Sequence, residues 1–235
     1  MNGYFDYYYL SNYYYIVLVV PMIILSLIAS SKVKSSFNKY SKVLSHKHIT
    51  GAQAAFEILR HYGITDVRIE RVGGNLTDHF DPRTNVIRLS DNVYNSTSVA
   101  AIGVACHEAG HAAQYAQSYA PIKVRNTVLP VANLGSKLGI PLAIFGLFLG
   151  FEPLAYAGVI FFSFAVLFQL ITLPVEFNAS KRALQVIGEA DILNEEEKSG
   201  AKKVLSAAAM TYVASLAVSI ASLLRLILTV NKRRK

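Results

Sequence analysis

The sequence contains a single cysteine, Cys106, which excludes an internal disulfide and a cysteine-based zinc finger. Charged residues make up 16% of the chain, which is few for a soluble domain. No basic residue precedes the first apolar run, whereas a cleaved signal peptide begins with a positively charged region. Internal repeats and low-complexity linkers are also absent from the sequence. The chain therefore does not read as a disulfide scaffold or as a processed secreted protein.

Long apolar runs indicate a membrane protein. We predict an uncleaved anchor within residues 1–30, with its apolar part from Leu10 to Ala29. A group of tyrosines precedes this run and is typical of a headgroup-level belt: Tyr4, Tyr7, Tyr8, Tyr9, Tyr13, Tyr14 and Tyr15. Lysines follow it at positions 32, 34, 39, 42 and 47, which favours the cytoplasmic side for the next segment.

A second apolar region runs from Val128 to Leu173 and is too long for one span. The sequence Gly150-Phe151-Glu152-Pro153 interrupts it, so residues 128–174 are predicted to form a transmembrane hairpin. A buried hairpin in a soluble protein is the alternative. Glu152 is the only charge between residues 139 and 172, which favours lipid.

The last part, residues 206–235, is predicted to be a membrane-associated helix with a basic tail. A full span would place that tail outside, against the positive-inside tendency, so a helix on the inner surface or packed on the domain is favoured. The net charge of +8 lies in short segments beside the apolar runs, which indicates contact with lipid headgroups. No aromatic-interleaved basic platform is present, so nucleic acid is not an expected partner.

The chemistry is concentrated in residues 97–119, where His107-Glu108-Ala109-Gly110-His111 forms an H-E-x-x-H pattern. Residues four apart share one face of a helix, so His107 and His111 can bind one metal ion while Glu108 reaches a water on it. This pattern is typical of zinc hydrolases with a Glu general base. The alternative is a core helix with two hydrogen-bonded histidines. Cys106 is interpreted as a core residue.

Zinc in such a site needs a third protein ligand. Glu176 is favoured because it stands alone at the predicted cytoplasmic end of a span, in the predicted segment 175–205. Glu152 is not favoured as the ligand, because it lies in the predicted outer turn. The acidic residues from Glu189 to Glu197 are not favoured either, because they are interpreted as a solvated turn and the start of a helix that Asn194 caps. His46 reads as solvated, and His79 is a weak candidate for stabilising an oxyanion from a loop.

Two smaller elements precede the motif in the predicted cytoplasmic segment 31–127. Thr50 and Gln53 form a capping-box pattern at the start of a helix. Residues 67–70 and 85–89 alternate like strands and are predicted to form a small antiparallel pair. An extended peptide could dock on the edge of that pair, although a purely structural hairpin fits equally well.

Two longer strings are more specific than the five-residue motif: DHFDPRTNVIRLSDNVYNSTSVAAIGVACHEAGHAAQYA and LPVEFNASKRALQ. On these strings the chain resembles the YugP-type family of neutral membrane zinc metallopeptidases, and more distantly the HtpX-like membrane proteases. The resemblance implies one zinc ion held by His107, His111 and Glu176, with Glu108 catalytic. The HtpX-like element has an Asp where this chain has Ser180, so the partner of a zinc-binding histidine is expected to differ.

The sequence therefore predicts a mainly α membrane protein with a gluzincin-like protease domain, a small antiparallel β element and three to four membrane helices. The expected function is zinc-dependent peptide-bond hydrolysis on polypeptides, among them membrane proteins, at the cytoplasmic face of the cell membrane. A membrane scaffold or adaptor with a structural zinc site is the alternative from another class. A metal-dependent amidase or lipid hydrolase using the same three ligands is a further enzymatic alternative.

Overall fold

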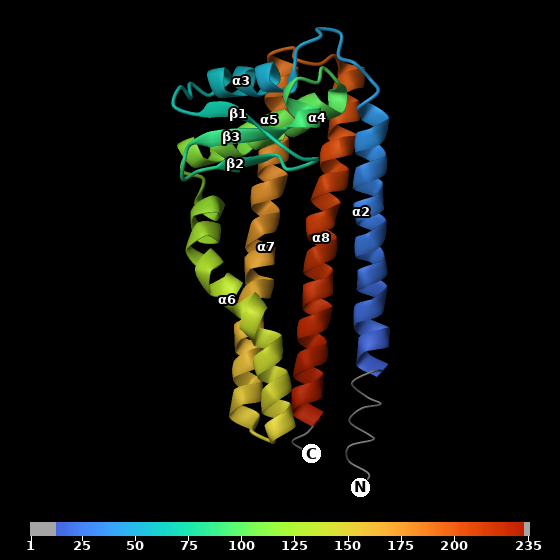
Figure 1. Cartoon of the computed structure of the whole chain (residues 1–235), viewed down its shortest axis with the longest axis vertical. Coiled ribbons are helices and arrows are strands. Elements are labelled where there is room, and N and C mark those ends of the chain that lie inside the picture. The colour runs from blue at the N-terminus through green and yellow to red at the C-terminus, as the bar shows by residue number, and fades with distance from the viewer. Residues whose placement is uncertain (1–12, 233–235) are drawn as a thin grey trace. The chain divides into compact units, whose positions relative to one another are not determined.

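Helices make up most of residues 13–232, the part of the chain that the computed structural model describes (Figure 1). In chain order the elements are η1 (Tyr15–Val19, a π-helical stretch), α2 (Val20–Tyr40), α3 (Gly51–His61), β1 (Arg68–Val72), β2 (His79–Asp81), β3 (Val86–Ser90), α4 (Asp91–Tyr94), α5 (Val99–Ala116), α6 (Ala120–Leu149), α7 (Glu152–Glu189) and α8 (Glu195–Lys232). The predicted fold class, a mainly α membrane protein with a small sheet, is confirmed. The tyrosines at positions 4–9 and the last residues of the basic tail lie outside the described residues.

The chain divides into two compact units. The first takes residues up to 29, residues 123–173 and residues from 211 onward. The second takes residues 30–122 and 174–210. Helices α2, α6, α7 and α8 each contribute to both units, so the chain passes between the units within continuous helices.

In the first unit, α6 and α7 form the predicted hairpin, and the break falls at Gly150 and Phe151. Gly150 has a φ of 72°, a conformation that glycine adopts without strain. Glycines let the two helices approach closely: a Cβ on Gly139 would lie 2.7 Å from Phe162 N, and one on Gly158 would lie 2.3 Å from Ala143 N. Small residues at such contacts are typical of helices that pack in lipid.

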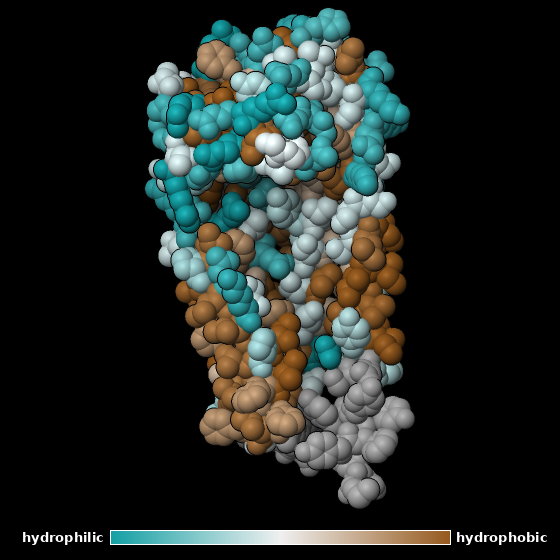
Figure 2. Space-filling view, in the orientation of Figure 1, coloured by the Kyte–Doolittle hydropathy of each residue, from teal (hydrophilic) through white to brown (hydrophobic). Residues whose placement is uncertain are grey.

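Within residues 13–232, four helical stretches are long and apolar enough to cross a membrane: Tyr15–Tyr40, Ala120–Leu149, Glu152–Glu189 and Glu195–Asn231. Their surfaces within the first unit carry exposed apolar side chains such as Phe148 and Ile160, and the surface there is mostly brown in Figure 2. The last stretch contains most of residues 206–235, and the expectation of a surface helix there stays a prediction. Helix α8 begins at Glu195, and its length and apolarity suit a span.

The sheet in the second unit is mixed, with strand order β1-β3-β2, so the predicted antiparallel pairing of residues 67–70 with 85–89 is wrong. β1 and β3 pair in parallel, and β2 pairs antiparallel with β3. The turn after Asp81 joins β2 to β3 as a hairpin, and Asn85 in it has a φ of 52°. Alternation alone does not distinguish the two directions, and the short strand at 79–81 was missed.

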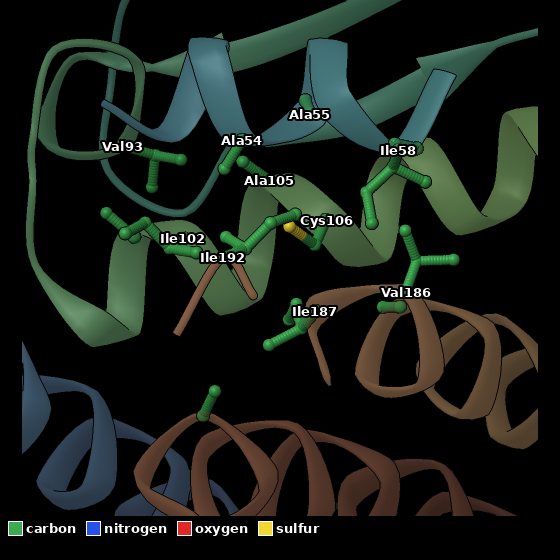
Figure 3. Close-up of a cluster of buried hydrophobic side chains, with 14 of the residues drawn as sticks. Ala54, Ala55, Ile58, Val93, Ile102, Ala105, Cys106, Val186, Ile187 and Ile192 are labelled. Carbon is green, nitrogen blue, oxygen red and sulfur yellow. The ribbon is translucent and has the colours of Figure 1, made fainter. Parts of the chain in front are cut away.

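The core of the second unit lies between α3, α5 and α7 (Figure 3). The predicted capping box of α3 is confirmed, because the Thr50 hydroxyl accepts from Gln53 N and the Gln53 side chain accepts from Thr50 N. Ile58 of α3, Ile102 of α5 and Ile187 of α7 are fully buried. Burial of each such side chain contributes about 1.5–3 kcal/mol.

His46 is exposed to solvent as predicted, and it also contacts the first turn of α8. Its Nδ1 lies 2.9 Å from Glu197 Oε2, and its backbone N–H donates to Glu197 Oε1 at 2.8 Å. Glu197 is buried, and it also accepts from Asn194 N while Asn194 accepts from Glu197 N. The predicted cap at Asn194 is therefore confirmed, whereas the solvated reading of Glu197 is wrong.

Helices α5 and α7 approach each other closely at Gly110. A Cβ at this position would lie 2.6 Å from the carbonyl oxygen of Ala179. Because that atom belongs to the backbone of α7, a side chain could be accommodated only if one helix moved. This contact sets the separation of the two helices one residue away from His111.

We expect Gly110→Ala to destabilise the protein by about 1–3 kcal/mol through overpacking. Gly103→Ala is the matched control on the same helix, because its Cβ would meet the Ala201 side chain at 3.3 Å and the substitution raises helix propensity. Thermal unfolding of the detergent-solubilised protein checks this. A larger loss for Gly103→Ala than for Gly110→Ala would contradict the packing argument.

Candidate metal centre

Helix α5 presents His107 and His111 on one face, one turn apart. The helix begins after Ser98, whose hydroxyl accepts from Ala101 N at 3.3 Å. The two imidazole rings are 4.7 Å apart and nearly perpendicular, at 83°. Both side chains are mostly buried yet keep 15% and 12% of their surface exposed. The pair is therefore held by the core and remains open to solvent on one side.

Glu176 of α7 reaches the same point from a distant part of the chain. Its Oε2 atom lies 3.4 Å from His107 Nε2 and 3.5 Å from His111 Nε2. One donor atom from each of the three residues lies within 4.8 Å of the other two. Among residues 13–232, these three side chains form the group of His, Cys, Asp and Glu residues that could hold a metal ion. The structure thus brings together the three ligands predicted from the sequence.

The spacing of these atoms suits a metal ion better than direct hydrogen bonds. Two ligand atoms that share a tetrahedral zinc at bond lengths of about 2.0–2.1 Å lie roughly 3.3 Å apart. Hydrogen bonds between nitrogen and oxygen are shorter, with a mode near ~2.9 Å. Glu176 Oε2 is buried and has no hydrogen bond among the described residues. A buried carboxylate oxygen without a hydrogen bond is costly unless a cation balances it, so the donor set fits a divalent metal.

Each imidazole is oriented through its other nitrogen. His107 Nδ1 lies 3.0 Å from the Ser180 hydroxyl, and His111 Nδ1 lies 3.0 Å from Gln114 Oε1. Gln114 Oε1 can only accept, so His111 Nδ1 donates to it. A metal ion on His107 Nε2 would likewise place the ring proton of His107 on Nδ1, beside the Ser180 hydroxyl. Such contacts fix the ring orientation of a metal-binding histidine. Ser180 therefore contacts the histidine itself, where the HtpX-like element has an Asp.

Gln114 was missed by sequence reasoning, although it lies three residues after His111 on one helix face. It is fully buried, and its amide nitrogen donates to Val175 O at 2.8 Å and to Asn178 Oδ1 at 2.9 Å. Gln114 thus joins His111 to the turn of α7 that carries Glu176. Asn178 Oδ1 also accepts from Arg182 Nε at 2.7 Å, which extends this network along α7.

Electrostatics at the site favour positive charge. Burial alone would lower the pKa of His111, but the Glu176 carboxylate 3.5 Å away, the charge of Glu108 and the contact with Gln114 together raise it above its ordinary value. Cys106, next to His107, is held in its neutral form, because burial raises the pKa of its thiol. Figure 3 shows its sulfur among the core side chains, which supports the reading of Cys106 as a core residue.

Glu108 lies beside the metal-binding face and contacts the sheet. Its Oε2 accepts a hydrogen bond from the backbone N–H of Phe80 in β2 at 3.0 Å. β2 pairs only with β3, so the Phe80 amide points away from the sheet toward Glu108. His79 is the first residue of β2 rather than a loop residue, and its Nδ1 lies 2.8 Å from Thr77 O.

Comparison with known proteins gives the family. A family model described as "Putative neutral zinc metallopeptidase" matches residues 15–231. The chain is 50% identical over 204 residues to the "Putative membrane protease YugP" of Bacillus subtilis (strain 168), covering 87% of this chain and 91% of that protein. No solved structure matches the chain. The resemblance seen in the sequence is confirmed: the chain belongs to the family of neutral zinc metallopeptidases that includes this membrane protease homologue.

Proposed function

We propose that the protein is a zinc-dependent endopeptidase of the gluzincin type. His107, His111 and Glu176 are the ligands of one zinc ion, and Glu108 is the general base. The observation that carries the proposal is the convergence of two imidazole nitrogens on a buried carboxylate oxygen that has no hydrogen bond within residues 13–232. The partial exposure of both histidines supports it, because substrate and water need access to the ion.

In this mechanism Glu108 transfers protons, and Ser180 and Gln114 orient the zinc-binding histidines. A zinc ion held by His107, His111 and Glu176 would supply Lewis acidity to a scissile carbonyl and would lower the pKa of a water toward about 7. Glu108 accepts the proton of that water on a carboxylate oxygen and later returns it to the leaving amine. Ser180 and Gln114 keep the two imidazoles oriented during this exchange.

The outer edge of β2 is the proposed docking site for the substrate. An extended peptide can add to a free strand edge through backbone hydrogen bonds. The Phe80 amide already points from this edge to Glu108, so a peptide on the same edge would run past the general base. Membrane proteins and membrane-proximal segments are the proposed substrates, because α7 carries Glu176 directly after its apolar stretch.

The number of ligands supports catalysis over a structural role. Structural zinc usually has four protein ligands, whereas catalytic zinc has three and an open position. Within the described residues the group has three members. A scaffold with a closed zinc site would need a fourth His, Cys, Asp or Glu at the same point.

We further propose a multi-pass protein of the cell membrane, with the second unit facing the cytoplasm. The lysines that follow the first apolar stretch support this orientation. The α6–α7 turn at Gly150 would then lie outside. The length and apolarity of α8 fit a final span that leaves the C-terminus outside.

Glu108→Gln should abolish peptide hydrolysis while leaving the zinc content unchanged. The amide is close in shape to the carboxylate but cannot accept the water's proton, and Glu108 is not a proposed ligand. Casein-type proteolysis and metal analysis of the wild type and variant, side by side in detergent, check this. Hydrolysis at the wild-type rate in the variant would contradict the assignment of the base.

Glu176→Ala should remove most of the bound zinc, because two imidazoles alone form an incomplete site. Glu196→Ala is the matched control, since Glu196 is exposed on α8 and outside the group. Zinc stoichiometry after dialysis against metal-free buffer is the measurement. If Glu176→Ala keeps one zinc per chain, the third ligand lies elsewhere.

Gln114→Leu should weaken zinc binding about 10–100-fold without removing a ligand, because His111 loses the acceptor for its Nδ1 proton. Gln117→Leu, at the C-cap of the same helix, is the control. Its Oε1 accepts a hydrogen bond from Arg182 Nη1. Competition with a chelating dye gives the dissociation constants. Equal affinities in the two variants would show that Gln114 does not orient His111.

The orientation can be tested with single cysteines, because Cys106 is buried. Phe151→Cys in the α6–α7 turn should react with a membrane-impermeant maleimide on intact cells. Glu196→Cys in the second unit should react only after permeabilisation. The reverse pattern would place the second unit outside the cytoplasm.

A further inference from the structure

A second candidate site lies in the second unit, between the segments of α7 and α8 that belong to it. It is a pocket of about 690 Å³, within the range of small-ligand sites. Ser180 is in its wall, so the pocket lies on the Nδ1 side of His107, away from the nitrogen that faces Glu176. The proposed protease mechanism uses none of this space.

Positive charge converges on this pocket from both helices. Lys181 comes from α7, and Lys198 and Lys202 come from one face of α8, four residues apart. Glu195 is the only acidic residue in the lining, and its Oε1 lies 3.3 Å from Lys198 Nζ. Within the described residues, Lys181 and Lys202 have no ion-pair partner. The net charge of the lining is therefore positive, and its ligand should carry an anionic group.

The same pocket has an apolar part. Phe177 and Leu184 line it beside the lysines, and Phe177 is 47% exposed. A free phosphate would leave these apolar surfaces in water. An amphiphile with an anionic head and an apolar tail would cover the lysines and the apolar side chains together.

The position of the pocket along its helices matches the headgroup layer. The charge-free run of α7 ends at Val175, and that of α8 begins at Val204. Lys181 and Lys198 each lie six residues from these limits, and Lys202 lies two residues away. At 1.5 Å per residue these intervals are about 3–9 Å. The polar layer on each side of a bilayer is about 5–8 Å thick.

We propose that this pocket binds the headgroup of an anionic phospholipid from the leaflet next to the second unit. The lysine ammonium groups and the Ser199 and Ser206 hydroxyls supply donors for the phosphate. Phe177, which is nearer to the apolar run of α7 than Lys181 is, contacts the start of the acyl chains. Bound lipid would hold the two helices together at the membrane surface.

The test uses the full chain in an uncharged detergent, titrated with phosphatidylglycerol or phosphatidylcholine and read by native mass spectrometry. The triple variant Lys181→Gln, Lys198→Gln, Lys202→Gln removes the pocket charges. The control Lys32→Gln, Lys34→Gln, Lys203→Gln removes the same charge from lysines outside the lining. A third variant replaces the three pocket lysines with arginine and retains the charge. Glycerol phosphate and inorganic phosphate compete in separate arms.

The wild type, the control and the arginine variant should prefer phosphatidylglycerol, while the pocket variant should bind it at least ~10-fold more weakly, since each lysine contributes about five-fold. Unchanged thermal unfolding of the pocket variant shows that the loss is not misfolding. If the pocket variant unfolds at a lower temperature, the arginine variant decides the outcome. Retained phosphatidylglycerol binding by the arginine variant supports the proposal, and loss of that binding overturns the proposal. Equal losses in the pocket and control variants would overturn it, as would equal affinity for the two lipids. Displacement of the lipid by either soluble phosphate at micromolar concentration would make this a free-anion site and also overturn it.

Discussion

The close approach of α5 and α7 at Gly110 is the constraint on which the candidate centre depends. Two imidazoles from one helix define only part of a metal site, and the third ligand must come from another element. A Cβ at Gly110 would collide with the Ala179 carbonyl, so the glycine lets α7 lie against α5. That packing brings Glu176 Oε2 to 3.4 and 3.5 Å from the two Nε2 atoms. The geometry of the site is thus a consequence of helix packing within the second unit.

The same packing places a polar network inside an apolar core. Gln114 is fully buried, and it contacts His111, the Val175 carbonyl and Asn178. Buried polar groups are tolerated when each finds a partner, and here Glu176 Oε2 has no hydrogen-bond partner in the described part of the chain. An orphaned acidic oxygen between two imidazoles is the kind of exception that indicates a cation, and the family of zinc metallopeptidases gives that cation its identity.

Continuous helices connect the chemistry to the apolar part of the chain. Helix α7 carries apolar residues through its first half and Glu176, Asn178 and Ser180 in the turns that follow. Helix α8 has the opposite order, with a charged, capped start and an apolar remainder. Each helix therefore changes from polar to apolar surroundings along its length. Groups near that change, including the pocket lysines, lie where a headgroup layer would be.

The sequence by itself determined the parts that depend on local spacing. His107 and His111 share a face because helical periodicity requires it, and the capping residues Thr50 and Asn194 and the break at Gly150 follow from local chemistry. The Glu176 assignment was inferred from its isolation beside a span and supported by family resemblance. Only the tertiary structure decided the parallel pairing of β1 with β3, the contact of His46 with Glu197, and the roles of Gln114 and Ser180 beside the histidines. These contacts join residues whose separation in the chain reaches 151 positions, and strand alternation or helical periodicity carries no information about which distant segment will lie alongside.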